Sequence, residues 1–211
     1  YSAELAKNSG RKIKHLFEAH PEIGVKLQRD SKAAHRFHTD KGGEILSAPL
    51  GGQIVGSGAN LLIIDDPIKS YEECTKSNLE GLIEWFRSVA YTRLMNSESH
   101  IIVFHQRWHE DDLAGWLKDS HSDPWVTITL PAIAVEDDEL GRKPGEALCP
   151  ELFTVEDYER TRKSVGDTVW HAHFQQSPAG KDGQHWKRNL WERYEKLPTK
   201  LDEVIIAGDL T

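Results

Sequence analysis

The sequence predicts an α/β fold, a mainly parallel sheet with flanking helices. Two short apolar runs, residues 61–64 (LLII) and 100–105 (HIIVFH), have the length and branched content of buried strands. Apolar residues at helical spacing, from Leu79 to Leu94, lie between them. Strand, helix and strand in this order form the βαβ pattern of a parallel sheet, whose buried strands are continuously apolar.

The N-terminal elements are predicted from their boundary residues. Ser2 is expected to cap a helix that runs to about residue 19, and His20-Pro21 ends it, because the residue before a proline leaves helical conformations. Residues 21–43 are polar and predict a loop with room for a short strand. Gly51-Gly52 is a tight-turn signal and predicts a hairpin between residues 44–50 and 53–55.

The later elements follow the same pattern. Residues 110–118 predict a helix with three carboxylates in its first turn, and residues 125–130 predict a third strand. Residues 134–148 are expected to form a loop. One or two helices are predicted from Thr154, their N-cap, to residue 176. A final strand is predicted at residues 204–207. We therefore expect an α/β domain at 1–135, a linker or helical subdomain at 136–198, and the first strand of another domain at 199–211.

Composition limits the classes of protein that the chain can belong to. The net charge is -8, so a broad basic nucleic-acid surface is excluded and any DNA contact must be local. Two distant cysteines form neither a disulfide framework nor a zinc motif, which favours a reducing, cytosolic compartment. No signal peptide and no apolar run of membrane-spanning length are present in the sequence.

A pair of carboxylates ends the first apolar strand. Ligands of open α/β sheets bind outside the carboxyl ends of the strands. There Asp65 can hold Mg²⁺, and Asp66 can orient or deprotonate an attacking water. The simpler interpretation is that both residues cap the following turn.

The second strand ends in a polar run. Gln106 and Arg107 could sense a γ-phosphate, because the guanidinium fork matches phosphate oxygens. His105 and His109 suggest a metal site only weakly, since no third ligand is evident. Residues 110–112 are most simply the acidic start of a helix.

Several segments, in order, resemble the large terminase subunit of tailed bacteriophages. The most specific is QRWHEDDLAGWL at residues 106–117. The others are LGGQIVGSGANLLIIDDP (50–67), EWFRSVAYTRL (84–94), LPAIA (130–134), LCPELF (148–153), AHFQQSP (172–178) and IIAGDLT (205–211). The resemblance covers nearly the whole chain.

The resemblance implies a DNA-packaging motor. In that family a P-loop ATPase drives double-stranded DNA into the procapsid, and an RNase H-like nuclease cuts the concatemer. By this resemblance Asp65 is the Walker B aspartate that binds Mg²⁺ with ATP, and Asp66 is the catalytic carboxylate beside it. Gln106 and Arg107 match the coupling motif, and Asp209 matches the first carboxylate that binds Mg²⁺ or Mn²⁺ in the nuclease.

The resemblance also implies partners and a location. The small terminase subunit, the portal protein and double-stranded DNA are the expected partners, with a homo-oligomeric ring during packaging and no membrane. The expected location is the host cytoplasm with transient docking at the portal, and the gene can belong to a prophage.

The chain departs from the family pattern in three places. The Gly-Lys-Ser/Thr phosphate loop is absent and is expected upstream of Tyr1, so this chain alone should hydrolyse ATP poorly or not at all. Only Asp209 of the nuclease carboxylates is present. The family's basic residue near Ser57 is missing, which removes support for a phosphate or arginine-finger role of that loop.

Two alternatives remain open. The first is a non-catalytic DNA-binding or assembly module, favoured by aromatic and basic residues that interleave near the C-terminus: Trp186, Lys187, Arg188, Trp191 and Arg193. The same tryptophans could instead pack under the linker. The second alternative is an unrelated metallohydrolase that uses some of the 11 histidines.

Overall fold

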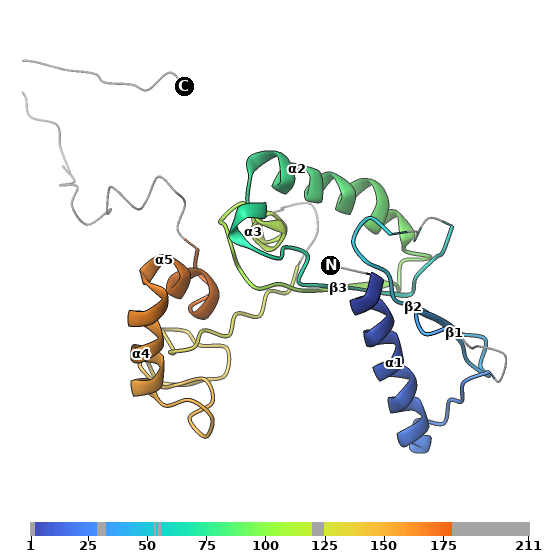
Figure 1. Ribbon diagram of the computed structural model, residues 1–211, viewed down its shortest axis with the longest axis horizontal. Helices are drawn as coiled ribbons and strands as arrows, with labels where there is room; N and C mark the ends of the chain where they lie inside the picture. Colours follow the sequence, from blue (N-terminus) through green and yellow to red (C-terminus); the bar gives the residue numbers. More distant parts are fainter. Residues whose placement is uncertain (1–2, 29–32, 53, 55, 120–124, 179–211) are drawn as a thin grey trace, which may run out of the picture.

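The computed structural model describes residues 3–28, 33–52, 54, 56–119 and 125–178. These residues form a mixed α/β structure with two small sheets and several helices (Figure 1). One sheet is a parallel pair of strands and the other is an antiparallel pair. The predicted α/β class is confirmed at this level. None of the helices in these ranges is long and apolar enough to cross a membrane.

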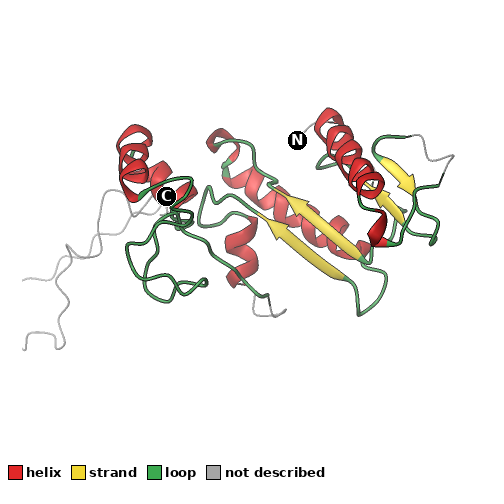
Figure 2. Ribbon diagram, turned by 90° about the horizontal axis from the view of Figure 1, so that it is seen from below, coloured by secondary structure: helices red, strands yellow, loops and turns green. Residues whose placement is uncertain are grey.

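A parallel pair of strands forms the centre of the fold. β3 (Leu61–Asp65) and β4 (His100–Phe104) run side by side in the same direction (Figure 2). Their register places Leu61 opposite His100 and Asp65 opposite Phe104. The two predicted strands are confirmed, and polar residues follow each of them at the carboxyl end of the pair, Asp66 after β3 and His105 after β4.

The connection between the two strands is helical, as predicted. A short 3₁₀ turn, η2 (Tyr71–Glu73), leads to α2 (Lys76–Trp85), which begins where the Thr75 side chain accepts a hydrogen bond from the Asn78 N–H. A π-helical turn, η3 (Phe86–Ala90), and a 3₁₀ turn, η4 (Tyr91–Arg93), continue the helix. The apolar pattern from Leu79 to Leu94 therefore predicted one continuous helical segment correctly.

The two faces of the parallel pair differ in burial. Leu62, Ile64, Ile101 and Val103 pack into a hydrophobic core with buried residues of α2. The alternate positions are exposed, including Ile63, Ile102 and Phe104. This alternation follows from the two-residue period of a strand.

The N-terminal segment contains a hairpin at a place different from the predicted one. It follows α1 (Ala3–Ala19), which ends before His20-Pro21 as predicted, and a 3₁₀ turn, η1 (Pro21–Ile23). β2 (Glu44–Leu46) pairs with the upstream strand β1 (Arg36–His38), a pairing that was not predicted, and the predicted partner of residues 44–50, residues 53–55, lies largely outside the described residues.

Hydrogen bonding explains where the hairpin turns. The Thr39 N–H donates to the Gly43 carbonyl at 2.8 Å, and the Thr39 hydroxyl accepts from the Gly43 N–H at 3.0 Å. These bonds select residues 39–43 as the loop, whereas Gly51-Gly52 makes an isolated turn. Ser2, Gln53 and Val55 lie outside the described residues.

The region after β4 departs from two predictions. α3 (Leu113–Asp119) begins later than expected, and the three carboxylates at 110–112 precede it instead of forming its first turn. Residues 125–130 are extended but have no ladder partner among the described residues, and Val126 is 88% exposed. The predicted third strand is therefore wrong, because an apolar run becomes a strand only where a neighbour satisfies its backbone groups.

The C-terminal described segment has a core of its own. It contains α4 (Val155–Val165), the short α5 (Asp167–Val169) and a π-helical turn, η5 (Trp170–Phe174), at one end of the molecule in Figure 1. Thr154 caps α4 in a capping box with Asp157, as predicted. Tyr158 and Trp170 pack with Ala132 and Ala147 in a second hydrophobic cluster. The domain boundaries near residues 135 and 198 stay predictions.

Candidate functional site

Asp65 and Asp66 lie where β3 ends. Asp65 is the last residue of the strand, and its side chain is exposed on the face that carries Ile63. Asp66 has a positive φ of 46°, a conformation in which Asp and Asn are enriched among residues other than glycine. The backbone conformation therefore changes between the two carboxylates, from the strand at Asp65 to the left-handed region at Asp66. Residues with such a backbone conformation are found preferentially at functional sites in proteins.

Two hydrogen bonds hold Asp66 against the end of β4. Its N–H donates to the Phe104 carbonyl at 2.8 Å, and its Oδ1 accepts from the Gln106 N–H at 3.1 Å. The structure thus brings Asp66 and Gln106 together, although they are far apart in sequence. We call this arrangement of Asp65, Asp66 and Gln106 the strand-end corner. The Gln106 side chain is exposed beside it.

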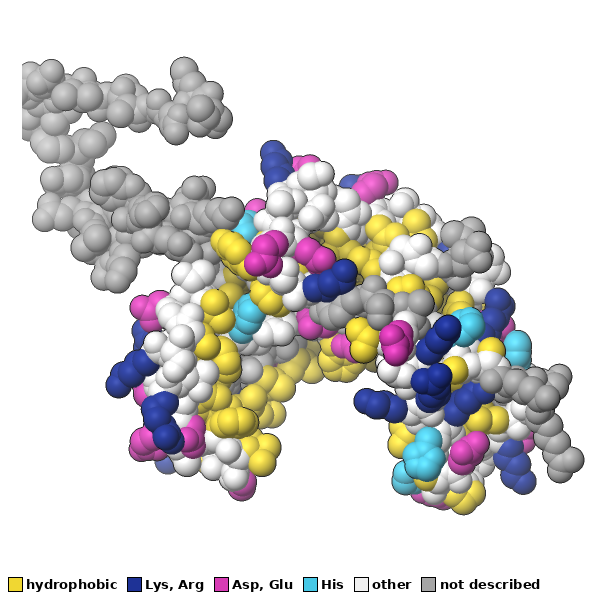
Figure 3. Space-filling model, in the orientation of Figure 1, with side chains coloured by type: hydrophobic (Ala, Val, Ile, Leu, Met, Phe, Trp, Pro, Cys, Tyr) yellow, Lys and Arg dark blue, Asp and Glu magenta, His cyan; other side chains and the backbone are white. Residues whose placement is uncertain are grey.

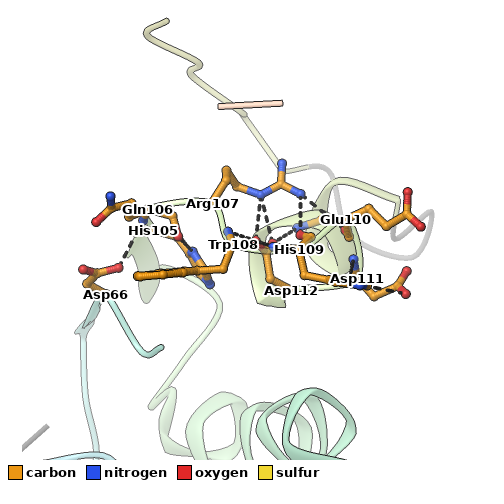
Figure 4. A network of polar contacts seen from close by, with 10 residues as sticks. Asp66, His105, Gln106, Arg107, Trp108, His109, Glu110, Asp111 and Asp112 are labelled. Atoms are coloured by element: carbon orange, nitrogen blue, oxygen red, sulfur yellow. Dashed lines mark hydrogen bonds and ion pairs between the residues drawn. The ribbon is translucent and has the colours of Figure 1, made fainter. Parts of the chain in front are cut away.

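Arg107 is held inside its own loop. Its Nε donates to both carboxylate oxygens of Asp112, at 2.9 and 3.0 Å. Its Nη2 donates to the carbonyl oxygens of His109 and Glu110, at 3.2 and 3.3 Å. Figure 4 shows the guanidinium directed at Asp112, with Asp66 and Gln106 on the other side of Trp108. Arg107 therefore fixes the shape of residues 107–112.

Asp112 is the centre of this loop. Its side chain is completely buried, and it accepts further hydrogen bonds from the N–H groups of Trp108, His109 and Gly115, at 3.0, 3.3 and 2.9 Å. Burying a carboxylate is costly unless it is paired and fully hydrogen-bonded, and Asp112 meets both conditions. The sequence placed it in an acidic cluster. Its position directly before Leu113 was the available signal that it caps the helix.

His105 lies behind the strand-end corner. Its Nδ1 is 2.6 Å from the Gln106 carbonyl oxygen, and because a carbonyl only accepts, Nδ1 carries the proton. Its Nε2 and the Trp108 Nε1 are buried, and neither has a hydrogen-bond partner among the described residues. Burial lowers the pKa of His105, an effect that the Asp112 carboxylate and, more weakly, Asp66 oppose.

A second histidine reaches this region from the C-terminal segment. The His173 ring lies edge-on to the Trp108 ring, with 4.1 Å between the centroids. Burial lowers the pKa of His173, and the negative charge of Asp66 opposes that shift. No sequence pattern indicated this contact, because Trp108 and His173 belong to different elements.

The carboxylates at the corner fit one kind of metal site. Among the described residues no group of three or more His, Cys, Asp or Glu side chains could hold a metal ion. Mg²⁺ in nucleotide sites is typically held by one or two carboxylates, together with phosphate oxygens and water. Asp65 and Asp66 therefore suit a metal that arrives with a phosphate ligand, rather than one enclosed by protein.

The remaining predicted site residues either lie outside the described residues or interact within their own loop. Asp209, Lys187, Arg188 and Arg193 lie outside the described residues. His105 and His109, weighed as metal ligands, interact within their own loop: the His109 ring nitrogen Nδ1 accepts from the Asp111 N–H at 3.1 Å.

Comparison with known proteins adds no identification. No protein-family model and no curated protein matches the chain. The assignment of a function depends on the geometry of the strand-end corner and on the sequence segments.

Proposed function

We propose that this chain is the part of a phage terminase large subunit that holds the Walker B and coupling residues of its P-loop ATPase. The observation that carries the proposal is the strand-end corner. Asp65 ends a parallel strand and Asp66 follows it, and the Gln106 N–H beyond the end of the neighbouring strand donates to Asp66. Nucleotide sites of open α/β sheets lie at such strand ends.

The two carboxylates have different roles in this proposal. Asp65 would hold Mg²⁺, which would supply positive charge to neutralise the ATP phosphate oxygens. Asp66 orients the attacking water and accepts its proton. Its Oδ1 already accepts from the Gln106 N–H, so its orientation depends on the exit of β4. That hydrogen bond gives a physical path from the phosphate site to the following loop.

Gln106 and Arg107 divide the coupling role. The exposed Gln106 side chain is the group available beside the corner. Arg107 supports it indirectly, because its guanidinium holds the loop through Asp112. A phosphate contact at Arg107 would have to compete with these bonds. We therefore assign phosphate sensing to Gln106 and loop positioning to Arg107.

The remaining proposals concern the whole motor. It translocates double-stranded DNA into a procapsid as a homo-oligomeric ring, with the small terminase subunit and the portal protein as partners. Its nuclease cuts concatemeric DNA with a divalent metal, Mg²⁺ or Mn²⁺, held in part by Asp209. The ATP phosphates require a Gly-Lys-Ser/Thr loop that this sequence does not contain.

The test is ATP hydrolysis by the polypeptide encoded by the whole reading frame that contains this chain, with and without double-stranded DNA. Asp66→Asn removes the proton acceptor but suits the same backbone conformation. We expect kcat to fall by about 10²- to 10⁴-fold, the usual contribution of a general base.

Asp137→Asn is the matched control. Asp137 is an exposed aspartate that also has a positive φ, 58°, and it lies in the loop after residue 134. The same chemical change on the same kind of backbone should leave hydrolysis unchanged. If Asp66→Asn hydrolyses ATP at the unmodified rate, the Walker B assignment is wrong.

A further inference from the structure

The contact between Trp108 and His173 joins two parts of the molecule that have separate cores. Trp108 packs against the cluster around β3 and β4, whereas His173 belongs to η5, whose Trp170 lies in the second cluster. The two rings meet in a T-shaped arrangement with 4.1 Å between their centroids. The His173 ring, from the C-terminal segment, thus lies against the loop that carries Gln106.

The His173 side chain extends from a well-anchored backbone. The Ala132 N–H donates to the Phe174 carbonyl at 2.7 Å. The Gln175 side-chain amide accepts from the Ile133 N–H at 3.0 Å and donates to the Ile133 carbonyl at 3.1 Å. The Gln176 side chain donates to the His173 carbonyl at 2.6 Å. The position of the His173 ring is therefore linked to the position of the whole C-terminal segment.

Trp108 is equally well connected to the strand-end corner. Its N–H donates to Asp112, and two peptide bonds before it the Gln106 N–H donates to Asp66. A displacement of the Trp108 ring must be absorbed by this short segment. The chain of contacts from His173 to Asp66 is thus continuous.

We propose that His173 is a positioning residue for the strand-end corner, and that through Trp108 it sets the geometry of Gln106 and Asp66 according to the position of the C-terminal segment. This inference deepens the proposed ATPase and depends on it for its catalytic readout only. The ring contact is the element that carries the coupling. Removing the ring should loosen the corner without removing any group that touches the substrate.

The first test uses this chain and does not depend on activity. Amide and indole NMR spectra of His173→Ala should show shifts of the Trp108 indole N–H and of the Gln106 and Asp66 amides. His173→Phe keeps a ring against Trp108 and should restore most of these positions. His171→Ala is the matched control, because His171 is exposed in the same π-helical turn.

Shifts confined to residues 170–177 in His173→Ala would overturn the proposal. If His173→Ala does not fold, the decision falls to His173→Phe and His173→Gln. The phenylalanine variant should keep the Gln106 and Asp66 resonances in place and the glutamine variant should move them, and equal spectra for the two would overturn the proposal.

The second test separates this proposal from the ATPase itself. In the polypeptide from the whole reading frame, His173→Ala should lower kcat for ATP by about tenfold while KM changes little, because a small misplacement of reacting groups is costly. An unchanged kcat, with Asp66→Asn inactive, would overturn the positioning role. If the NMR shifts occur but neither variant affects hydrolysis, the ATPase assignment fails and the positioning of the corner stands.

Discussion

At the residue scale, the geometry depends on two aspartates with different tasks. Asp66, after β3, accepts a hydrogen bond from the Gln106 N–H beyond the end of β4, and Asp112 accepts the hydrogen bonds that shape the following loop. Both use their oxygens to satisfy backbone N–H groups that would otherwise lack partners at the ends of elements. The loop of residues 106–112 is therefore held by a carboxylate at each end, by Asp66 at Gln106 and by its own Asp112.

Asp112→Asn is the most informative change for the loop. It leaves the Arg107 guanidinium, whose side chain is 15% exposed, without its buried counter-charge. We expect the free energy of unfolding to fall by about 3 kcal/mol, as for other broken buried pairs. Chemical denaturation measures this change.

Asp111→Asn is the control for that measurement. Its side chain is 77% exposed, so the same substitution one residue earlier should alter stability by less than about 0.5 kcal/mol. Equal losses in the two variants would contradict the assigned role of Asp112.

The sequence predicted part of this residue-scale picture. The place of Asp65 and Asp66 at the end of a strand followed from the apolar run before them. The partner of Arg107 did not follow, because a guanidinium fork suits a phosphate and a carboxylate equally well. Only the fold shows that Asp112 is near enough to take it.

At the element scale, close packing after β4 depends on a glycine. A side chain at Gly115, in α3, would collide with the Glu110 carbonyl and the Arg107 guanidinium. Helix α3 can approach its own N-terminal loop only because this position has no Cβ.

Gly115→Ala should therefore lower the free energy of unfolding by about 1 to 3 kcal/mol through overpacking. Gly81→Ala, in the exposed middle of α2, meets nothing within contact distance and should raise it by about 0.5 to 1 kcal/mol. Opposite signs in thermal or chemical unfolding would confirm the close approach. A stabilising Gly115→Ala would contradict it.

Local signals determined which elements were predicted well. Thr154 and Asp157 are close in sequence and form their capping box without help, so the start of α4 was predictable. Residues 125–130 have a strand-like composition, but a strand requires a partner, and composition does not supply one. The hairpin of β1 and β2 was not predicted for a related reason: its turn is closed by the hydrogen bond from the Gly43 N–H to the Thr39 hydroxyl, which composition does not reveal.

At the scale of the whole molecule, two hydrophobic clusters are joined by an extended segment and by the Trp108–His173 contact. Exposed apolar side chains lie on the open face of the strand pair, at Ile63 and Ile102, and in the connecting segment, at Val126. Figure 3 shows hydrophobic side chains along the inner side of an arch between the two ends.

This organisation predicts a pH-dependent stability. His105 and His173 both have a lowered pKa in the folded chain, mainly because burial disfavours the charged ring. As pH falls below the ordinary value of 6.5, the unfolded chain takes up protons that the folded chain does not. The free energy of unfolding should therefore fall with pH in this range.

Denaturation at pH values above and below 6.5 measures this dependence. The double variant His105→Gln, His173→Gln should show a smaller loss on acidification than the unmodified chain. An identical slope for the two proteins would contradict the role of these rings.

The polar loop after β4 has one more consequence. The partners of the buried Asp112 side chain all lie between Arg107 and Gly115, so its internal bonding requires no distant residue. The hydrogen-bonded loop is therefore encoded by one short, uninterrupted segment, residues 107–115, which can be transferred as a unit. Grafted onto another βαβ unit, the segment is expected to reform these hydrogen bonds, provided that the host supplies the strand before it and an apolar surface against which Trp108 and Leu113 pack.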